Sequence, residues 1–95
     1  MHFEWDPDKN AKNKKKHGVS FETAVKVFLD EKRIERLDEE HSSWYEERSI
    51  IIGRVSRTLI LFVVSTDRNG ITRLISARKA EKEEEDVYYE NYDAR

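Results

Sequence analysis

The sequence of 95 residues has no cysteine, one proline, three glycines and no long hydrophobic run. The absence of cysteine excludes disulfide bonds, thiolate nucleophiles and thiolate metal sites, and it is compatible with a reducing cytosol. No apolar stretch approaches the roughly 20 residues of a transmembrane helix, and no hydrophobic core of a signal peptide is present. We therefore expect a cytoplasmic protein that makes no use of a membrane.

Histidine is also scarce, with His2, His17 and His41 as its three positions. Their spacing matches no metal-ligand pattern, and the sequence pairs none of them with a carboxylate in a recognisable arrangement. A chain of this length forms one domain that buries roughly two-thirds of its surface around a single core, which leaves little room for a large cofactor. The sequence thus predicts one domain, residues 1–95, with no metal and no cofactor.

Charge is distributed unevenly, although the net charge is only −2. Residues 6–17 contain five lysines and two aspartates, whereas residues 79–95 contain seven acidic and three basic side chains. A basic segment beside an acidic one is typical of proteins that bind a polyanion, but a charge run is also typical of a solvated helix face. Charge alone does not choose between these two interpretations.

Two helices are predicted in the first third of the chain. Asp6 can cap a helix whose first turn accepts Pro7, and the glycine that follows His17 suits the left-handed end of this helix. Ser20 begins a second helix, whose apolar residues recur at helical spacing until the pattern breaks at Asp30. The apolar residues of this second helix are Phe21, Ala24, Val25 and Phe28.

The rest of the chain changes from a helical to an extended period. Strands are predicted at residues 33–38, 47–55, 58–66 and 71–77, and the sequence RNG at residues 68–70 favours a tight hairpin. Such short connections imply antiparallel neighbours. A final helix is predicted for residues 78–92. The fold class is therefore α+β: an antiparallel four-stranded meander with two N-terminal helices and one C-terminal helix, with one sheet face left for a ligand.

Aromatic side chains near both ends of the chain allow two interpretations. Phe3 and Trp5 alternate with charged residues, so their rings either pack against the sheet or stack on an unpaired base. Tyr88 is predicted to pack on the core, whereas Tyr89 and Tyr92 are candidates for contacts with a partner.

Three segments resemble a known family. They are FEWDPDKNAKNKKKHGVSFETAVKVFLD, then EER with Gly53 five residues after its arginine, and RLISARKA followed by Glu83 and Tyr88. In this order and spacing the chain resembles the BrnT family of type II toxin-antitoxin systems over nearly its whole length. The segment EKRIERLDEEHSSWYEER is strongly charged and departs from the family, so the resemblance assigns no role to His41 or Trp44.

The resemblance implies a fold and a function. The fold would be similar to that of the RelE-like ribonuclease toxins, and the activity would be RNA cleavage that inhibits translation. A BrnA-like antitoxin with a ribbon-helix-helix DNA-binding domain would neutralise the toxin in a higher-order complex. This complex would repress its own operon, so operator DNA would be contacted through the antitoxin.

Metal-independent RNA cleavage needs a base for the 2′-hydroxyl proton, a cation for the phosphorane and an acid for the leaving 5′-oxygen. We assign Arg48, Arg73 and Arg78 to the phosphate, and Glu47 or His17 to proton transfer. Glu47 beside arginines would have a lowered pKa, which makes it a weak base but a good orienting group. His17 has the alternative role of a helix cap, and Glu47 that of a surface ion pair.

The arginines also have structural alternatives. Arg48 can grip two phosphate oxygens with its planar fork. Arg78 is predicted at the start of the last helix, where free backbone N–H groups favour an anion, but it can instead pair with a glutamate such as Glu47. Arg73 is five residues from Arg78, so both share a site only if the chain leaves strand geometry near Ser76 and Ala77. Otherwise Arg73 is a cross-strand partner on the solvated face, beside Thr66 and Asp67.

Lysines complete the predicted RNA-binding surface. Lys9, Lys12 and Lys16 recur on one side of the first helix, and such a stripe suits an RNA backbone or a solvated helix face. Lys79 is predicted to support the phosphate site next to Arg78. A second class of function fits the same features: a non-catalytic module that binds nucleic acid or another protein.

Overall fold

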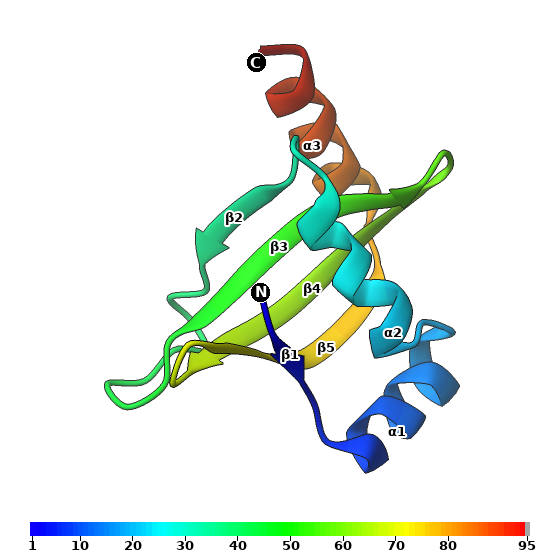
Figure 1. The fold of residues 1–95 in the computed structure, drawn as a ribbon. Coiled ribbons are helices and arrows are strands. Elements are labelled where there is room, and N and C mark those ends of the chain that lie inside the picture. The colour runs from blue at the N-terminus through cyan, green and yellow to red at the C-terminus, as the bar shows by residue number, and fades with distance from the viewer. Residues whose placement is uncertain (95) are drawn as a thin grey trace.

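A computed structural model describes residues 1–94 of the chain. Figure 1 shows an α+β arrangement in which helices lie against a twisted sheet. The elements in chain order are β1 (Phe3–Glu4), α1 (Pro7–His17), α2 (Phe21–Ala24), the 3-10 helix η1 (Val25–Leu29), β2 (Ile34–Leu37), β3 (Arg48–Ser56), β4 (Leu59–Arg68), β5 (Ile71–Lys79) and α3 (Lys82–Ala94). Within residues 1–94, no helix is long and apolar enough to cross a membrane.

The sheet has five strands in the order β1-β5-β4-β3-β2. Strands β2 to β5 form the antiparallel meander that the sequence predicts. The prediction of a purely antiparallel four-stranded sheet is wrong, because β1 pairs with β5 in parallel and makes the sheet mixed. The aromatic-polar alternation of residues 2–5 indicates a short strand, but it does not reveal the sheet partner of this strand, which lies almost 70 residues later in the chain.

The N-terminal helices begin and end at the predicted caps. The Asp6 carboxylate accepts a hydrogen bond from the Asp8 N–H at 2.9 Å, and Gly18 ends α1 in the left-handed region at φ 72°. Ser20 caps α2, which tightens into η1 before the chain leaves helical geometry at Asp30. A 3-10 turn at a helix end is common because its tighter hydrogen bonds satisfy terminal carbonyls.

The main core lies between these helices and one face of the sheet, and Figure 1 shows α2 crossing this face. Its fully buried side chains include Phe21, Val27 and Leu61. Phe3 and Trp5 pack against the same core, so packing rather than base stacking accounts for their rings. Gly53 lets η1 approach β3 closely, because a Cβ there would lie 2.9 Å from the Val27 Cβ.

The last strand is longer and the last helix starts later than predicted. Arg78 and Lys79 pair with Phe62 and Leu61 of β4, so they lie in β5 and not at the start of a helix. The carboxylate of Glu84 accepts the Glu81 N–H at 2.7 Å, which is a capping interaction at the start of α3. The prediction that free helix N–H groups stand beside Arg78 is therefore wrong: strand pairing continues past residue 77, and a glutamate occupies the helix end.

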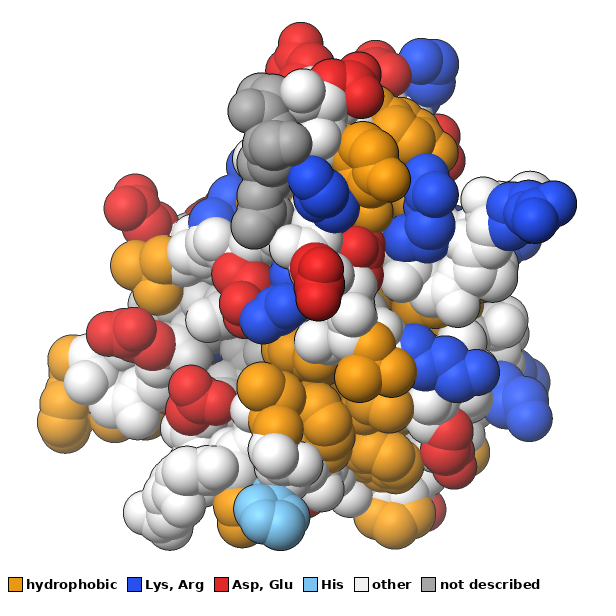
Figure 2. All heavy atoms as spheres, turned by 45° about the horizontal axis from the view of Figure 1, so that its top comes forward, with side chains coloured by type: hydrophobic (Ala, Val, Ile, Leu, Met, Phe, Trp, Pro, Cys, Tyr) orange, Lys and Arg blue, Asp and Glu red, His pale blue; other side chains and the backbone are white. Residues whose placement is uncertain are grey.

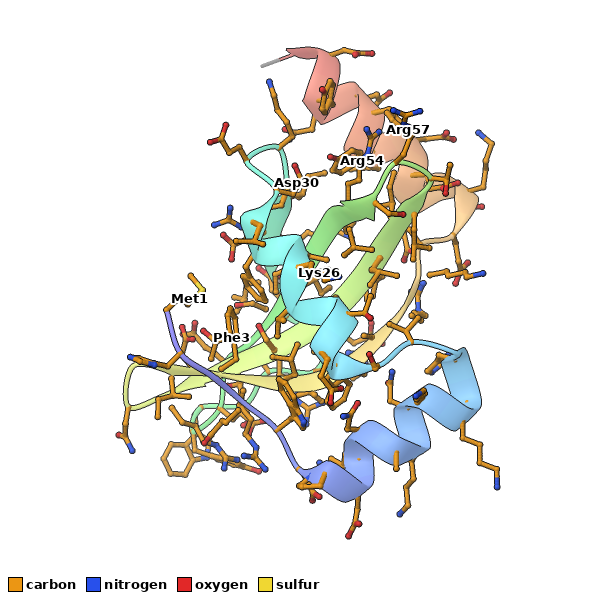
Figure 3. All side chains as sticks on the ribbon, turned by 45° about the vertical axis from the view of Figure 1, so that its right-hand side comes forward. Met1, Phe3, Lys26, Asp30, Arg54 and Arg57 are labelled. Atoms are coloured by element: carbon orange, nitrogen blue, oxygen red, sulfur yellow. The ribbon has the colours of Figure 1, made fainter. Side chains whose placement is uncertain are left out.

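Helix α3 covers only one end of the second sheet face, as Figure 1 shows. Tyr88 is fully buried there with Ile52 and Ile60, as the sequence predicts for Tyr88. The Tyr88 hydroxyl donates to the Asp30 carboxylate at 2.6 Å, and the backbone N–H of Arg54 donates to the same carboxylate oxygen at 2.8 Å. Figure 3 shows Asp30 and Arg54 at this end of the sheet.

Hydrogen bonding at this junction changes the ionisation of both partners. Burial and the hydrogen bond to Asp30 raise the pKa of Tyr88 above its ordinary range. Burial alone would raise the pKa of Asp30, but hydrogen bonds from Tyr88 and from the backbone outweigh it and lower that pKa. The Asp30 carboxylate therefore stays charged to lower pH than usual and keeps its bond to α3.

Candidate active site

A hollow of about 360 Å³ opens on the part of the second sheet face that α3 leaves uncovered. Residues on three neighbouring strands line it: Arg48 and Ile50 on β3, Phe62 and Val64 on β4, and Ser76 and Arg78 on β5. Asp38, Glu40 and His41 from the loop after β2 line its rim. We refer to this hollow as the arginine pocket. Its volume lies within the range of small-ligand sites, roughly 300–1,000 Å³.

Strand register places the two arginines of the pocket on one face. Arg48 lies opposite Thr66, and Phe62 lies opposite Arg78. Thr66 and Phe62 are four residues apart on β4, and opposite residues of an antiparallel pair share a face, so both arginines project from the same side of the sheet. The open face predicted for a ligand therefore holds Arg48 and Arg78 together.

Arg48 enters the pocket with part of its guanidinium free. Its Nε donates to Glu46 at 3.0 Å, and within residues 1–94 its two terminal nitrogens have no hydrogen-bond partner. Hydrogen bonding from Arg48 lowers the pKa of Glu46, which also pairs with Arg68 at 3.4 Å. Glu46 thus holds the Nε of Arg48, while the two terminal nitrogens of the guanidinium remain available for an anion.

Arg78 is held more firmly. Its two terminal nitrogens donate to the two Glu84 oxygens at 2.8 Å each, and its guanidinium lies 4.1 Å from the centre of the Phe62 ring. This bidentate pair raises the pKa of Arg78 and lowers that of Glu84. The structural alternative predicted for Arg78 involved Glu47, and the glutamate that pairs with it is Glu84 of α3.

Arg73 reaches the same sheet face through a β-bulge. Ser65 pairs with Leu74 and Val64 with Ser76, so Ile75 is an extra residue in β5. This irregularity lies one residue before Ser76, near which the sequence left a departure from strand geometry open, and it lets Arg73 and Arg78 share a face despite their odd separation. Arg73 lies opposite Thr66, and it pairs with Glu4 of β1 at 3.3 Å. It does not line the arginine pocket.

The predicted proton-transfer residues lie outside the pocket. Glu47 is exposed just before β3, and its contact within the described chain is a backbone carbonyl that accepts the Thr66 hydroxyl. His17 lies at the end of α1, where it lines a different hollow. Lys79, also predicted for this site, is exposed and lies opposite Leu61, which places it on the other sheet face from Arg78.

The lysine stripe forms a second hollow beside the first. Lys9, Lys12, Lys16 and His17 of α1 line about 210 Å³ together with Ile75 and Ser76 of β5. Ser76 also lines the arginine pocket, so the two hollows meet at this residue. The structure thus brings the predicted lysines together and sets them next to the arginines.

Sequence reasoning missed His41 and Asp38. The His41 Nδ1 lies 3.0 Å from Asp38 Oδ2, and both residues line the rim of the arginine pocket. The sequence signal was the Asp-x-x-His spacing, because an aspartate that accepts a backbone N–H of the following turn brings the two side chains together. Within the described residues, no group of three histidine, cysteine or acidic side chains is arranged to hold a metal ion.

Two further hollows lie on the helix side of the sheet, next to η1. One is lined mainly by apolar residues, including Met1, Phe3 and Phe28, and Figure 2 shows hydrophobic side chains gathered on this side. The other lies between Lys26 and Arg54, which are labelled in Figure 3. Neither combines two arginines with a histidine, so the arginine pocket is the candidate active site.

The fold and the pocket define a small α+β domain that presents Arg48 and Arg78 together on an open sheet face. The sequence model described as "Ribonuclease toxin, BrnT, of type II toxin-antitoxin system" matches residues 5–84. The chain therefore belongs to the BrnT family of ribonuclease toxins.

A solved structure resembles the same fold. The crystal structure of the Brucella abortus ribonuclease toxin BrnT aligns with a TM-score of 0.65 and 24% sequence identity, covering 86% of this chain and 99% of that one. This likeness shows that the two chains share a fold. A search of curated proteins found no match to this chain.

Proposed function

We propose that this protein is a toxin that cleaves RNA at the arginine pocket and thereby inhibits translation. The observation that carries the proposal is the convergence of Arg48 and Arg78 on one open sheet face of a BrnT-family chain. Arginine forks match the geometry of phosphate oxygens, and a half-enclosed site strengthens their interaction with a phosphate. The resemblance to the BrnT family implies a RelE-like fold, and the α+β architecture supports this part of the proposal.

The reaction is an internal transesterification of the RNA backbone. The 2′-hydroxyl oxygen attacks the adjacent phosphorus, the bond from phosphorus to the 5′-oxygen breaks, and a 2′,3′-cyclic phosphate remains. Arg48 and Arg78 stabilise the negative charge that gathers on the phosphorane. Because two guanidinium groups supply this positive charge, we propose an endoribonuclease that needs no metal ion.

Arg78 must be shared between the substrate and Glu84. The carboxylate of Glu84 already occupies both terminal nitrogens, so an incoming phosphate approaches a guanidinium whose charge is partly neutralised. Arg48, whose fork is free, is the first contact for the phosphate, and Arg78 completes the site. Arg73, held by Glu4 on the same sheet face, supports the RNA outside the pocket.

The partner of such a toxin is an antitoxin protein. We propose that this partner is a BrnA-type antitoxin with a ribbon-helix-helix domain. The toxin and the antitoxin form a cytoplasmic complex, and this complex represses the operon that encodes both proteins. The proposal is supported by family membership, since type II systems are toxin-antitoxin pairs. We expect the reading frame next to the gene for this chain to encode a short ribbon-helix-helix protein, and inspection of the genome checks this.

The test is cleavage of RNA by partner-free protein in EDTA, followed by analysis of the new ends. We expect ends with a 2′,3′-cyclic phosphate, and we expect both Arg48→Ala and Arg78→Gln to abolish cleavage and growth inhibition. Arg57→Ala is the matched control, because Arg57 is exposed and does not line the pocket. Thermal melting of each variant must match the wild type, since Arg78→Gln removes the partner of Glu84.

Two results would contradict the proposal. Undiminished toxicity of both pocket variants at equal expression would remove the pocket from the reaction. RNA that is retarded in a gel but never shortened would instead favour the alternative function, a non-catalytic module that binds nucleic acid or protein.

A further inference from the structure

The loop between β2 and β3 brings a histidine and a shielded carboxylate to the arginine pocket. The side chain of Asp38 is only 11% exposed, whereas that of His41 is 61% exposed. The His41 Nδ1 lies 3.0 Å from one Asp38 oxygen and 3.2 Å from the other. Within residues 1–94, His41 is the residue whose side chain hydrogen-bonds this carboxylate.

Hydrogen bonding fixes which ring nitrogen is available. A carboxylate only accepts, so the Nδ1 of His41 must carry the hydrogen that lies between them. In the neutral imidazole the other nitrogen, Nε2, then has a free lone pair. The arrangement leaves His41 with a proton acceptor on the ring edge that faces away from Asp38.

The same loop is tied to the strand that carries the phosphate-binding arginine. The backbone N–H of Asp38 donates to the Arg48 carbonyl at 2.7 Å, and the backbone N–H of Arg48 donates to the Ser42 hydroxyl at 2.9 Å. That hydroxyl donates to the Asp38 carbonyl at 2.6 Å. These bonds hold the backbone of Asp38 against the first residue of β3, so the imidazole and the Arg48 guanidinium stand at one pocket.

We propose that His41 is the general base of the RNA cleavage reaction and that Asp38 is its positioning residue. The proposal rests on the ribonuclease function proposed above. The His41 Nε2 takes the 2′-hydroxyl proton while the 2′-oxygen bonds to phosphorus, and the 5′-oxygen leaves with the electron pair of its bond to phosphorus. Water supplies the proton for that oxygen, and the hydroxide so formed removes the proton from His41.

The other candidate bases do not meet the phosphate-binding arginines. Glu47 does not line the arginine pocket, and His17 lines the hollow on α1. The charged groups that face His41 are Asp38 and Glu40 of its own loop, Arg48 of β3 and Arg78 of β5. The two arginines hold the phosphate, so the imidazole is left to move the proton.

The experiment measures single-turnover cleavage of a randomised single-stranded RNA pool by the full chain, across pH. For the wild type, cleavage should rise with pH and then level off, as expected for a reaction that needs a general base. For His41→Gln, the rate should fall about 100-fold or more and this rise should disappear, while RNA retention on a filter and thermal melting stay unchanged. Added imidazole should restore part of the activity of His41→Ala.

Two further variants sharpen the test. His2→Gln is the matched control, because His2 is exposed and lies outside the pocket, and it should cleave like the wild type. Asp38→Asn should lower the cleavage rate without weakening RNA retention, because the amide can present an N–H to Nδ1 and favour the tautomer that blocks Nε2.

The outcomes separate this inference from the proposed function. If the wild type does not cleave RNA, the ribonuclease function fails and the inference fails with it. If the wild type cleaves and His41→Gln cleaves equally well with the same pH profile, the inference alone is overturned. A His17→Gln variant that loses the pH-dependent rise, with His41→Gln unaffected, would place the base on α1 instead.

Discussion

Asn13 of α1 completes the exposed edge of β5. Its amide nitrogen donates to the carbonyl oxygens of Ala77 and Val19 at 2.8 and 2.9 Å, and its side-chain oxygen accepts the Ala77 N–H at 3.1 Å. One buried side chain thus makes the two backbone bonds that a neighbouring strand would make. Because these bonds dock α1 on β5, Asn13 sets where the lysine stripe lies relative to the arginine pocket.

We predict that Asn13→Ala destabilises the protein by about 2–4 kcal/mol, because it leaves the buried N–H and C=O of Ala77 without partners. The measurement is urea denaturation followed by circular dichroism. Lys14→Ala is the matched control on the exposed side of the same helix, and it should change stability by less than about 0.5 kcal/mol. Equal stability of Asn13→Ala and Lys14→Ala would show that water replaces the lost hydrogen bonds.

The role of Asn13 was not predictable from its position in the chain. An asparagine within a lysine-rich helix reads as one more solvated residue, and its partner lies 64 positions later. The location of Arg48, in contrast, was predictable from the sequence, because it lies at the start of a long apolar strand and strand alternation constrains its face. Local patterns identify the residues that strands present, but they do not identify the side chains that join distant elements.

At the scale of the element, β5 shows the same limit. The hairpin before it was predicted from Asn69 and Gly70, and both adopt the positive φ angles that a tight turn requires, 53° and 80°. The bulge at Ile75 and the continuation to Lys79 were not predicted, because both depend on pairing with β4. These two features place Arg73 and Arg78 on one face and move Arg78 away from the start of the helix.

Helix α3 restrains the pocket through Glu84. We predict that Glu84→Gln strengthens RNA binding by the full chain several-fold. Arg78 keeps its place, but the negative charge of Glu84 no longer neutralises its guanidinium, which is then freer to attract a phosphate. Glutamine at this position can still accept the Glu81 N–H, so the helix start is retained and stability should fall by less than about 1 kcal/mol. Filter binding and thermal melting check both expectations.

A matched control for this change is Glu83→Gln, which removes one exposed charge from the same helix turn. Its effect on RNA binding should be smaller than that of Glu84→Gln, because Glu83 makes no hydrogen bond to Arg78. If both variants strengthen binding equally, the effect would come from net charge and not from the release of Arg78.

At the scale of the whole molecule, two basic hollows join across β5. The sequence predicted the stripe of Lys9, Lys12 and Lys16 and, separately, a phosphate site of Arg48, Arg73 and Arg78. Their adjacency at Ser76 could not be predicted, since it follows from the docking of α1 on the sheet edge. We infer that the backbone of one RNA strand can follow this joined surface from α1 to the pocket.

This path predicts the salt dependence of RNA binding. Replacing Lys9, Lys12 and Lys16 together by glutamine should weaken binding and reduce the slope of log K against log salt concentration by about 2, because three phosphate contacts to a single strand are lost. The measurement is filter binding of single-stranded RNA over a salt series. Cleavage at saturating RNA should be retained, because the arginine pocket is unchanged.

The matched control removes the same number of charges elsewhere. Lys14, Lys15 and Lys26 are exposed and do not line the hollow beside α1. Their joint replacement by glutamine lowers the net charge equally, so it should reduce long-range attraction while leaving most of the salt slope intact. The proposed path requires the two triple variants to differ, and identical slopes would mean that RNA responds to net charge without following α1 to the pocket.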